Sequence, residues 1–328
     1  MKKFWRIALI ATAVSAIVYF GAALVMTFWP APTFAADPFP VAQHGGAEFT
    51  PQQVTMRDGE TLFARRFPAD SDDTILLLHG VTSDSSAFNN TAVLLQQASD
   101  AEVIALDLRG HGRSGGTAGD VDYIGQYQDD VADVVAAIRA EKPNGRLILA
   151  GHSMGGGIAL QFAMLDDAPA VDGYLLFAPH LGTNAPTMMP RPEGEMADMA
   201  AAYSQLHVPR LIGLIMLNNV GIRGLNHLDT LYFNLTDEVT HTYSFGATAN
   251  SAPQDYVAAL TAVDAPMLVV VGSQDEAFVA DEYPAAVTAH SGGQVHVIAG
   301  ENHNTILDSA EAMAIIENWL GEMVISKQ

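Results

Sequence analysis

The sequence has no cysteine among its 328 residues. Disulfide bonds, metal sites built on thiolates and catalysis by a cysteine nucleophile are therefore all excluded. The cysteine count does not reveal the redox compartment in which the protein works.

Basic residues are also scarce. The chain carries 15 Lys and Arg against 37 Asp and Glu, which gives a formal net charge of −22. Such a surface repels the phosphates of nucleic acids, so we expect no nucleic-acid partner. Charged residues of both signs amount to 16% of the chain and apolar residues to 49%, which predicts a large buried core.

Charged side chains are absent from residues 7–29, and three basic residues precede this segment within residues 2–6. As a helix the segment would be about 34 Å long, enough to span the hydrocarbon core of a bilayer. We interpret residues 1–29 as an N-terminal membrane anchor, with the rest of the chain on the extracytoplasmic side, periplasmic in a Gram-negative cell. The alternative is a signal sequence cleaved near residues 33–35, which would give a secreted protein. Signal cores have roughly 7–15 apolar residues, fewer than this segment.

A domain with alternating strands and helices follows the anchor. Four prolines in residues 30–47 predict a stiff, extended tether, and Asp58–Gly59 then predicts a hairpin turn. Beyond the hairpin, helical stretches such as 87–98 and 127–140 alternate with continuous apolar runs. These runs suit strands that are buried on both faces, and they lie at residues 74–78, 103–108, 147–150, 174–177 and 267–271. The alternation predicts an α/β fold with a doubly wound, mostly parallel sheet.

One long interval, residues 183–264, lacks such an apolar run and is too long for a plain loop. It contains predicted helices at 194–206 and 208–217, so we interpret it as a mostly helical cap, or lid, inserted into the sheet domain. The sheet domain then comprises residues 48–182 and 265–328. The cap is rich in methionine, whose flexible side chains pack well and also suit a surface that accepts acyl chains of varied shape.

A candidate nucleophile lies in the segment Gly151-His-Ser-Met-Gly155, which matches the pattern G-x-S-x-G. In this pattern a serine occupies a sharp turn between a strand and a helix. The short, largely apolar run 146–150 predicts the strand, and residues 158–165 predict the helix. The serine is Ser153.

Five motifs along the chain carry a family resemblance. They are Leu78–Gly80, Asp107–Ser114, Gly151–Gly155, Gly272–Asp275 and Gly300–His303. With these motifs, and over about residues 50–322, the chain resembles the α/β-hydrolase superfamily. It resembles most closely the monoacylglycerol-lipase and lysophospholipase-like branch with a helical cap.

The resemblance implies a catalytic triad in the chain order serine, acid, histidine. By this resemblance Ser153 is the nucleophile, His303 is the base that takes its proton, and Asp275 is the acid that orients the imidazole. Glu276 and Asp281 lie close to Asp275 in the sequence and stay open as alternatives for the acid.

The resemblance also implies an oxyanion hole formed by the backbone N–H groups of Val81 and Met154. We interpret His79 as a residue that organises the loop before Val81 rather than as a catalyst. Residues 110–115 satisfy the dinucleotide pattern G-x-G-x-x-G, but more glycines follow and no helix can begin there, so we interpret them as a structural loop. With no metal or nucleotide motif in the sequence, we expect no cofactor and no metal.

These observations predict a serine hydrolase that cleaves carboxylic esters through an acyl-enzyme. The expected substrates are small-molecule esters or lipids, such as monoacylglycerols or lysophospholipids, and the N-terminal helix would bind the membrane. A serine aminopeptidase or a thioesterase on the same fold is the enzymatic alternative. A catalytically silent binding or scaffold protein is the non-enzymatic one.

Overall fold

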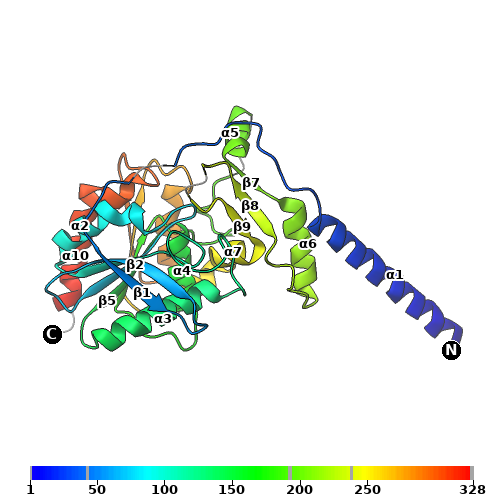
Figure 1. Ribbon diagram of the computed structural model, residues 1–328, viewed down its shortest axis with the longest axis horizontal. Coiled ribbons are helices and arrows are strands. Elements are labelled where there is room, and N and C mark those ends of the chain that lie inside the picture. The colour runs from blue at the N-terminus through cyan, green and yellow to red at the C-terminus, as the bar shows by residue number, and fades with distance from the viewer. Residues whose placement is uncertain (1, 42–43, 191–193, 237–238, 326–328) are drawn as a thin grey trace.

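The computed structural model describes residues 2–41, 44–190, 194–236 and 239–325 (Figure 1). Small parts of the predicted anchor, tether, cap and sheet domain lie outside these ranges, at residues 1, 42–43, 191–193, 237–238 and 326–328.

An eight-stranded sheet forms the centre of the fold, in the spatial order β1-β2-β4-β3-β5-β6-β10-β11. β1 and β2 form the predicted hairpin and are antiparallel, and β2 is also antiparallel to β4. All strands from β4 to β11 in this order run parallel. The strands are β1 (Thr50–Thr55), β2 (Thr61–Phe67), β3 (Thr74–Leu78), β4 (Glu102–Leu106), β5 (Leu147–His152), β6 (Gly173–Phe177), β10 (Met267–Gly272) and β11 (Gln294–Ile298). The predicted doubly wound, mostly parallel α/β sheet is confirmed.

Helices cover both faces of this sheet, which explains why its inner parallel strands are largely apolar. In β3, Leu76 and Leu78 pack in the core on the side of α3, α4 and α9. Ile75 and Leu77 pack on the opposite side with α2 and α10. The helices of the sheet domain are α2 (Asn89–Ser99), α3 (Gln126–Glu141), α4 (Met154–Ala163), α9 (Tyr283–His290) and α10 (Ala310–Ile325), with short 3-10 turns η1 (Ser85–Phe88), η2 (Ala280–Glu282) and η3 (Thr305–Asp308).

The cap contains helices and also a small sheet that the sequence analysis did not predict. Its elements are α5 (Glu195–Tyr203), β7 (Ser204–Leu206), α6 (Val208–Asn219), β8 (Asp229–Phe233), β9 (Thr242–Ser244), α7 (Phe245–Asn250) and α8 (Tyr256–Ala262). β7, β8 and β9 form an antiparallel three-stranded sheet. The helix predicted over 194–206 therefore ends at Tyr203. These strands have three to five residues, and most of these residues are only partly buried, so the strands lack the continuous apolar runs that identify the central strands.

The N-terminal helix α1 (Lys2–Thr27) projects from the body of the molecule (Figure 1). Its residues Lys3–Thr27 are long and apolar enough to cross a membrane, which both an anchor and a signal sequence satisfy. The segment after it lies along the cap, since Phe39 N–H donates a hydrogen bond to Asn234 O at 2.8 Å. The aromatic rings of Phe39 and Tyr203 are 5.5 Å apart. The described part of the segment between α1 and β1 therefore contacts the cap.

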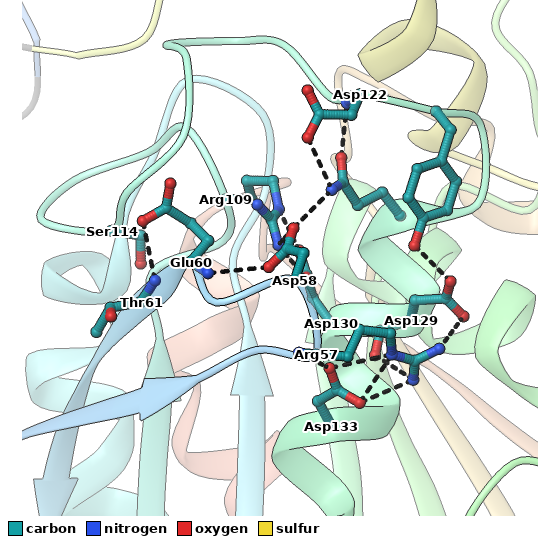
Figure 2. Close-up of polar contacts among 12 residues, drawn as sticks. Arg57, Asp58, Glu60, Thr61, Arg109, Ser114, Asp122, Asp129, Asp130 and Asp133 are labelled. Carbon is teal, nitrogen blue, oxygen red and sulfur yellow. Dashed lines mark hydrogen bonds and ion pairs between the residues drawn. The ribbon is translucent and has the colours of Figure 1, made fainter.

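Ion pairs, one of them buried, connect the β1–β2 turn, the loop after β4 and helix α3 (Figure 2). Arg109 donates hydrogen bonds to both carboxylate oxygens of Asp130 on α3, at 2.7 and 2.8 Å. It also lies 2.9 Å from Asp58 Oδ2 at the hairpin turn. The side chains of Arg109 and Asp130 are 4% and 3% exposed, so each charge depends on the other for compensation. The Arg57–Asp133 pair nearby is more exposed, with Arg57 at 50%.

We expect Asp130→Ala to lower the free energy of unfolding by about 3 kcal/mol, because it leaves the Arg109 guanidinium buried and only partly compensated. The matched control is Asp133→Ala, which breaks an ion pair on the same helix that water can replace, and should cost less than about 1 kcal/mol. Urea denaturation followed by circular dichroism measures both. Equal losses for the two variants would contradict the assigned role of burial.

Candidate active site

Ser153 alone makes the turn between the central sheet and α4, because β5 ends at His152 and α4 begins at Met154. Its backbone has φ 52° and ψ −115°, a conformation that costs energy for any residue with a Cβ atom. Two hydrogen bonds hold the turn. Ser153 N–H donates to Phe177 O at 3.0 Å, and Ser153 O accepts from His180 N–H at 2.9 Å. The end of β6 therefore fixes the strained serine.

Glycines let α4 begin directly against the sheet. A Cβ atom at Gly155 would lie 2.1 Å from Leu78 O, and one at Gly151 would lie 2.5 Å from Gly155 O. Such distances are far below van der Waals contact, so a side chain at either position would push the first turn of α4 away from β3 and β5. The motif needs glycine here for close packing.

Asp275 and His303 follow the ends of β10 and β11 and form a hydrogen bond. Asp275 Oδ2 lies 2.8 Å from His303 Nδ1. The other carboxylate oxygen accepts from the N–H groups of Ala277 and Phe278, each at 2.8 Å. The Asp275 side chain is fully buried, and its bonds fix the orientation of the ring. A proton held on Nδ1 leaves Nε2 free to accept one.

The two alternative acids do not face the imidazole ring. Glu276 Oε2 accepts a hydrogen bond from the backbone N–H of His303, at 3.1 Å. Asp281 lies on the exposed turn η2. Of the three acids considered from the sequence, Asp275 is the one that bonds to the ring of His303.

The loop that carries His303 lies beside the serine turn. The ring N–H of His152 donates to His303 O at 2.8 Å, and the two imidazole rings are 4.6 Å apart. Within the described residues, no hydrogen bond joins the Ser153 hydroxyl to His303. Such bonds are often long in ligand-free enzymes and shorten when substrate binds.

The loop after β3 lies against Ser153. A Cβ atom on Gly80 would be 3.3 Å from Ser153 Cβ. His79 shapes this loop, since its Nδ1–H donates to Gly80 O at 2.8 Å and its Nε2 accepts from Leu108 N–H at 3.0 Å. In the described part of the chain, the N–H groups of Val81 and Met154 donate no hydrogen bond, so both are free for a ligand oxygen.

Tyr243, on β9 of the cap, is a site residue that the sequence analysis missed. Its hydroxyl accepts from Thr82 N–H at 2.6 Å and lies 3.0 Å from His111 Nε2. His111 Nδ1 in turn bonds to Arg109 O at 2.8 Å. The cap therefore holds the loop next to Val81. No local signal marks this tyrosine, because its partner lies 161 residues away in the sequence.

Four histidines are packed around this site, of which His79, His111 and His152 are buried and His180 is partly buried. Burial lowers the pKa of His79 and His180 to about 4, and that of His111 and His152 to about 3. All four rings are therefore neutral at neutral pH. Among the described residues, no group of three or more His, Asp or Glu side chains could hold a metal ion.

The low pKa values predict that acid destabilises the fold. Below the ordinary histidine pKa of 6.5, these histidines bind protons in the unfolded chain but not in the folded chain. The free energy of unfolding therefore falls as pH decreases. Each histidine contributes up to about 1.4 kcal/mol per pH unit, until the folded state is protonated too. Urea unfolding at several pH values between about 7.5 and 5 measures this slope.

His180→Phe supplies the control for this prediction. It removes one of the four titrating rings while preserving an aromatic contact with Phe278, whose ring lies 5.4 Å from that of His180. We expect the slope to decrease by up to about 1.4 kcal/mol per pH unit. A free energy of unfolding that does not change with pH over this range would contradict the neutral state of the buried rings.

Comparisons with known proteins agree with this architecture. The family described as serine aminopeptidase, S33 matches residues 69–310. An uncharacterized protein of Mycobacterium tuberculosis is 28% identical over 269 residues, which cover 77% of this chain and 76% of that protein. A monoacylglycerol lipase of Mycolicibacterium smegmatis is 31% identical over 114 residues, 32% of this chain and 40% of that protein. A solved membrane phospholipase A, described as a bacterial virulence factor, is similar with a TM-score of 0.56 and 18% identity, over 98% of this chain and 99% of its own.

Proposed function

The chain belongs to the serine aminopeptidase S33 family, in the monoacylglycerol-lipase-like branch of the α/β-hydrolases, and we propose that it is a serine hydrolase of carboxylic esters. The observation that carries the proposal is the buried bond between Asp275 Oδ2 and His303 Nδ1, next to the strained turn at Ser153. This arrangement suits a base that is oriented by a carboxylate and activates a hydroxyl.

In the proposed reaction Ser153 Oγ attacks the ester carbonyl carbon while His303 Nε2 takes the hydroxyl proton. The carbonyl oxygen becomes negative and accepts hydrogen bonds from the N–H groups of Val81 and Met154. As the bond to the alcohol breaks, His303 returns the proton to the leaving oxygen, and the acyl group stays on Ser153. Asp275 stabilises the imidazolium that forms in between.

Water completes the cycle. His303 takes a proton from a water molecule, whose oxygen attacks the acyl carbon. The carbon bond to Ser153 Oγ then breaks, the serine oxygen regains a proton from His303, and the carboxylic acid is released. The free enzyme is restored without a cofactor.

We infer that the esters are lipid-like. The ring of Phe278 lies 5.4 Å from that of His303, so an apolar side chain lies beside the imidazole, and Met188 forms a backbone bridge with Phe278. Such surroundings suit an acyl chain. Two of the compared proteins are, by name, a monoacylglycerol lipase and a membrane phospholipase A. An N-terminal helix retained as an anchor, with the enzyme outside the cytoplasm, would keep the site near lipids.

Variants of Ser153 and Asp275 test the mechanism. Ser153→Ala should abolish covalent labelling by a fluorophosphonate, and Ser153→Ala and Asp275→Asn should each lower kcat for nitrophenyl esters by about 10⁴-fold or more, because nucleophile and imidazole act as a unit. Glu276→Gln is the matched control, since Glu276 bonds only to the backbone of His303 and not to its ring. Full activity of Ser153→Ala would show that hydrolysis does not use Ser153, and no labelling and no ester hydrolysis by the folded wild-type protein would favour the catalytically silent alternative.

The aminopeptidase alternative follows from the description of the matched family. A screen of short-chain and long-chain nitrophenyl esters and of aminoacyl anilides separates the two activities. We expect kcat/KM to be highest for esters. Apolar surroundings stabilise an acyl chain by contact, but they leave the charged ammonium group of an aminoacyl substrate without a polar partner. A preference for the anilides would replace the lipase proposal with a peptidase.

A further inference from the structure

The membrane-helix candidate α1 does not project freely along its whole length, because its last turns pack against the cap helix α6. Tyr19 Oη donates a hydrogen bond to Met216 O at 2.8 Å. Nearer the end of α1, a Cβ atom at Gly213 would lie 2.6 Å from Ala23 O and 2.5 Å from Thr27 Oγ1. From Tyr19 to Ala23 along α1, the contacted residue of α6 changes from Met216 to Gly213, which is nearer the start of α6. The two helices therefore cross in antiparallel directions. A glycine at the crossing lets their backbones touch, as in helix pairs within membranes.

The depth of this crossing follows from the length of α1. The hydrocarbon core is about 30 Å thick, or about 20 helical residues. Because the residues at positions 2, 3 and 6 are basic, the part of α1 within the hydrocarbon core begins no earlier than Ile7. About twenty residues from there, this part ends near Met26. Tyr19 and Ala23 then lie in the half of the bilayer farther from the cytoplasm. The part of α6 that touches them must lie at a similar level.

The outward face of α6 is apolar. Val208, Ile212 and Ile215 follow one another at the i, i+4, i+7 spacing of a single helix face, and each is 39–43% exposed. The opposite face is occupied, since Leu214 and Leu217 pack with Phe245 in the cap. We call Val208, Ile212 and Ile215 the α6 stripe.

The one charged residue of α6 is directed away from this stripe. Arg210 donates hydrogen bonds to Thr27 O at 3.0 Å, Asp229 O at 2.8 Å and Tyr232 Oη at 2.7 Å. These partners lie at the end of α1 and on β8. Because the guanidinium is satisfied by protein atoms, it does not oppose the burial of the stripe in a lipid phase.

We propose that the α6 stripe contacts lipid acyl chains in the leaflet farther from the cytoplasm, so that α1 and α6 form one membrane-bound unit. This proposal depends on the anchored form of the protein proposed above, but not on the proposed ester hydrolysis. Only a short stretch of sequence separates this unit from the candidate site. Phe245, which packs on α6, follows Tyr243 by two residues. The cap strand that holds the Thr82 loop is thereby attached to the bilayer.

The absence of cysteine from the sequence allows a direct test with single labels. Ile215→Cys, labelled with the fluorophore NBD, is compared in full-length protein reconstituted into phosphatidylcholine vesicles. The vesicles either contain or lack lipids with a spin-label quencher on the acyl chain. Glu311→Cys, on the exposed surface of α10, is the matched control.

We expect the emission from position 215 to be blue-shifted and to fall roughly two-fold or more with the quencher, because the label lies within the hydrocarbon. Emission from position 311 should not change. A blue shift without quenching would mean that protein, such as a second copy of the chain, covers the stripe, and would overturn the proposal. A water-like spectrum at 215, or a mature membrane protein whose mass lacks α1, would overturn it as well. Fluorophosphonate labelling of the same samples reports separately on Ser153.

Discussion

The close packing of α4 on β3 and β5 is the constraint on which the site depends. Gly155 places the first turn of α4 against Leu78 O, and Gly151 leaves room for that turn at the end of β5. The chain can then reverse only through a residue with positive φ, and this residue is Ser153. The conformational cost is met by the hydrogen bonds to Phe177 and His180 and by the packed sheet beneath. A reactive hydroxyl on a rigid turn is the kind of preorganisation that hydrolysis of an acyl group requires.

The cap is part of the same construction. Its residue Tyr243 lies between Thr82 and His111, and His79 holds Gly80 and Leu108 on the other side of the loop. These bonds fix the backbone next to Val81, whose N–H is proposed to bind the oxyanion. A small shift of this donor weakens its interaction with the developing charge. A movement of the cap would therefore reach the proposed oxyanion hole through Tyr243 as well as through substrate access.

The N-terminal segment contacts the cap, as the cap contacts the loop at the site. α1 packs on α6, and Phe39 in the tether pairs with Asn234 beside β8. The helix and the tether thus contact the cap at two places, in addition to the proposed role of α1 as an anchor. In the proposed, membrane-anchored hydrolase of lipid-like esters, this arrangement would connect the bilayer, the cap and the loop at Val81 through one series of contacts.

The sequence alone determined the features that depend on local pattern. Apolar runs at residues 74–78 and 267–271 identified strands buried on both faces, the uncharged segment 7–29 identified the long helix, and the motif around Ser153 identified its turn. The short strands of the cap escaped prediction, since half-buried strands of three to five residues have no pattern of their own. Only the tertiary structure decided which acid bonds to the His303 ring, that Tyr243 reaches Thr82, and that α1 packs on α6. Each of these is a contact between segments far apart in the chain, and its geometry follows from the packing of whole elements rather than from the residues around it.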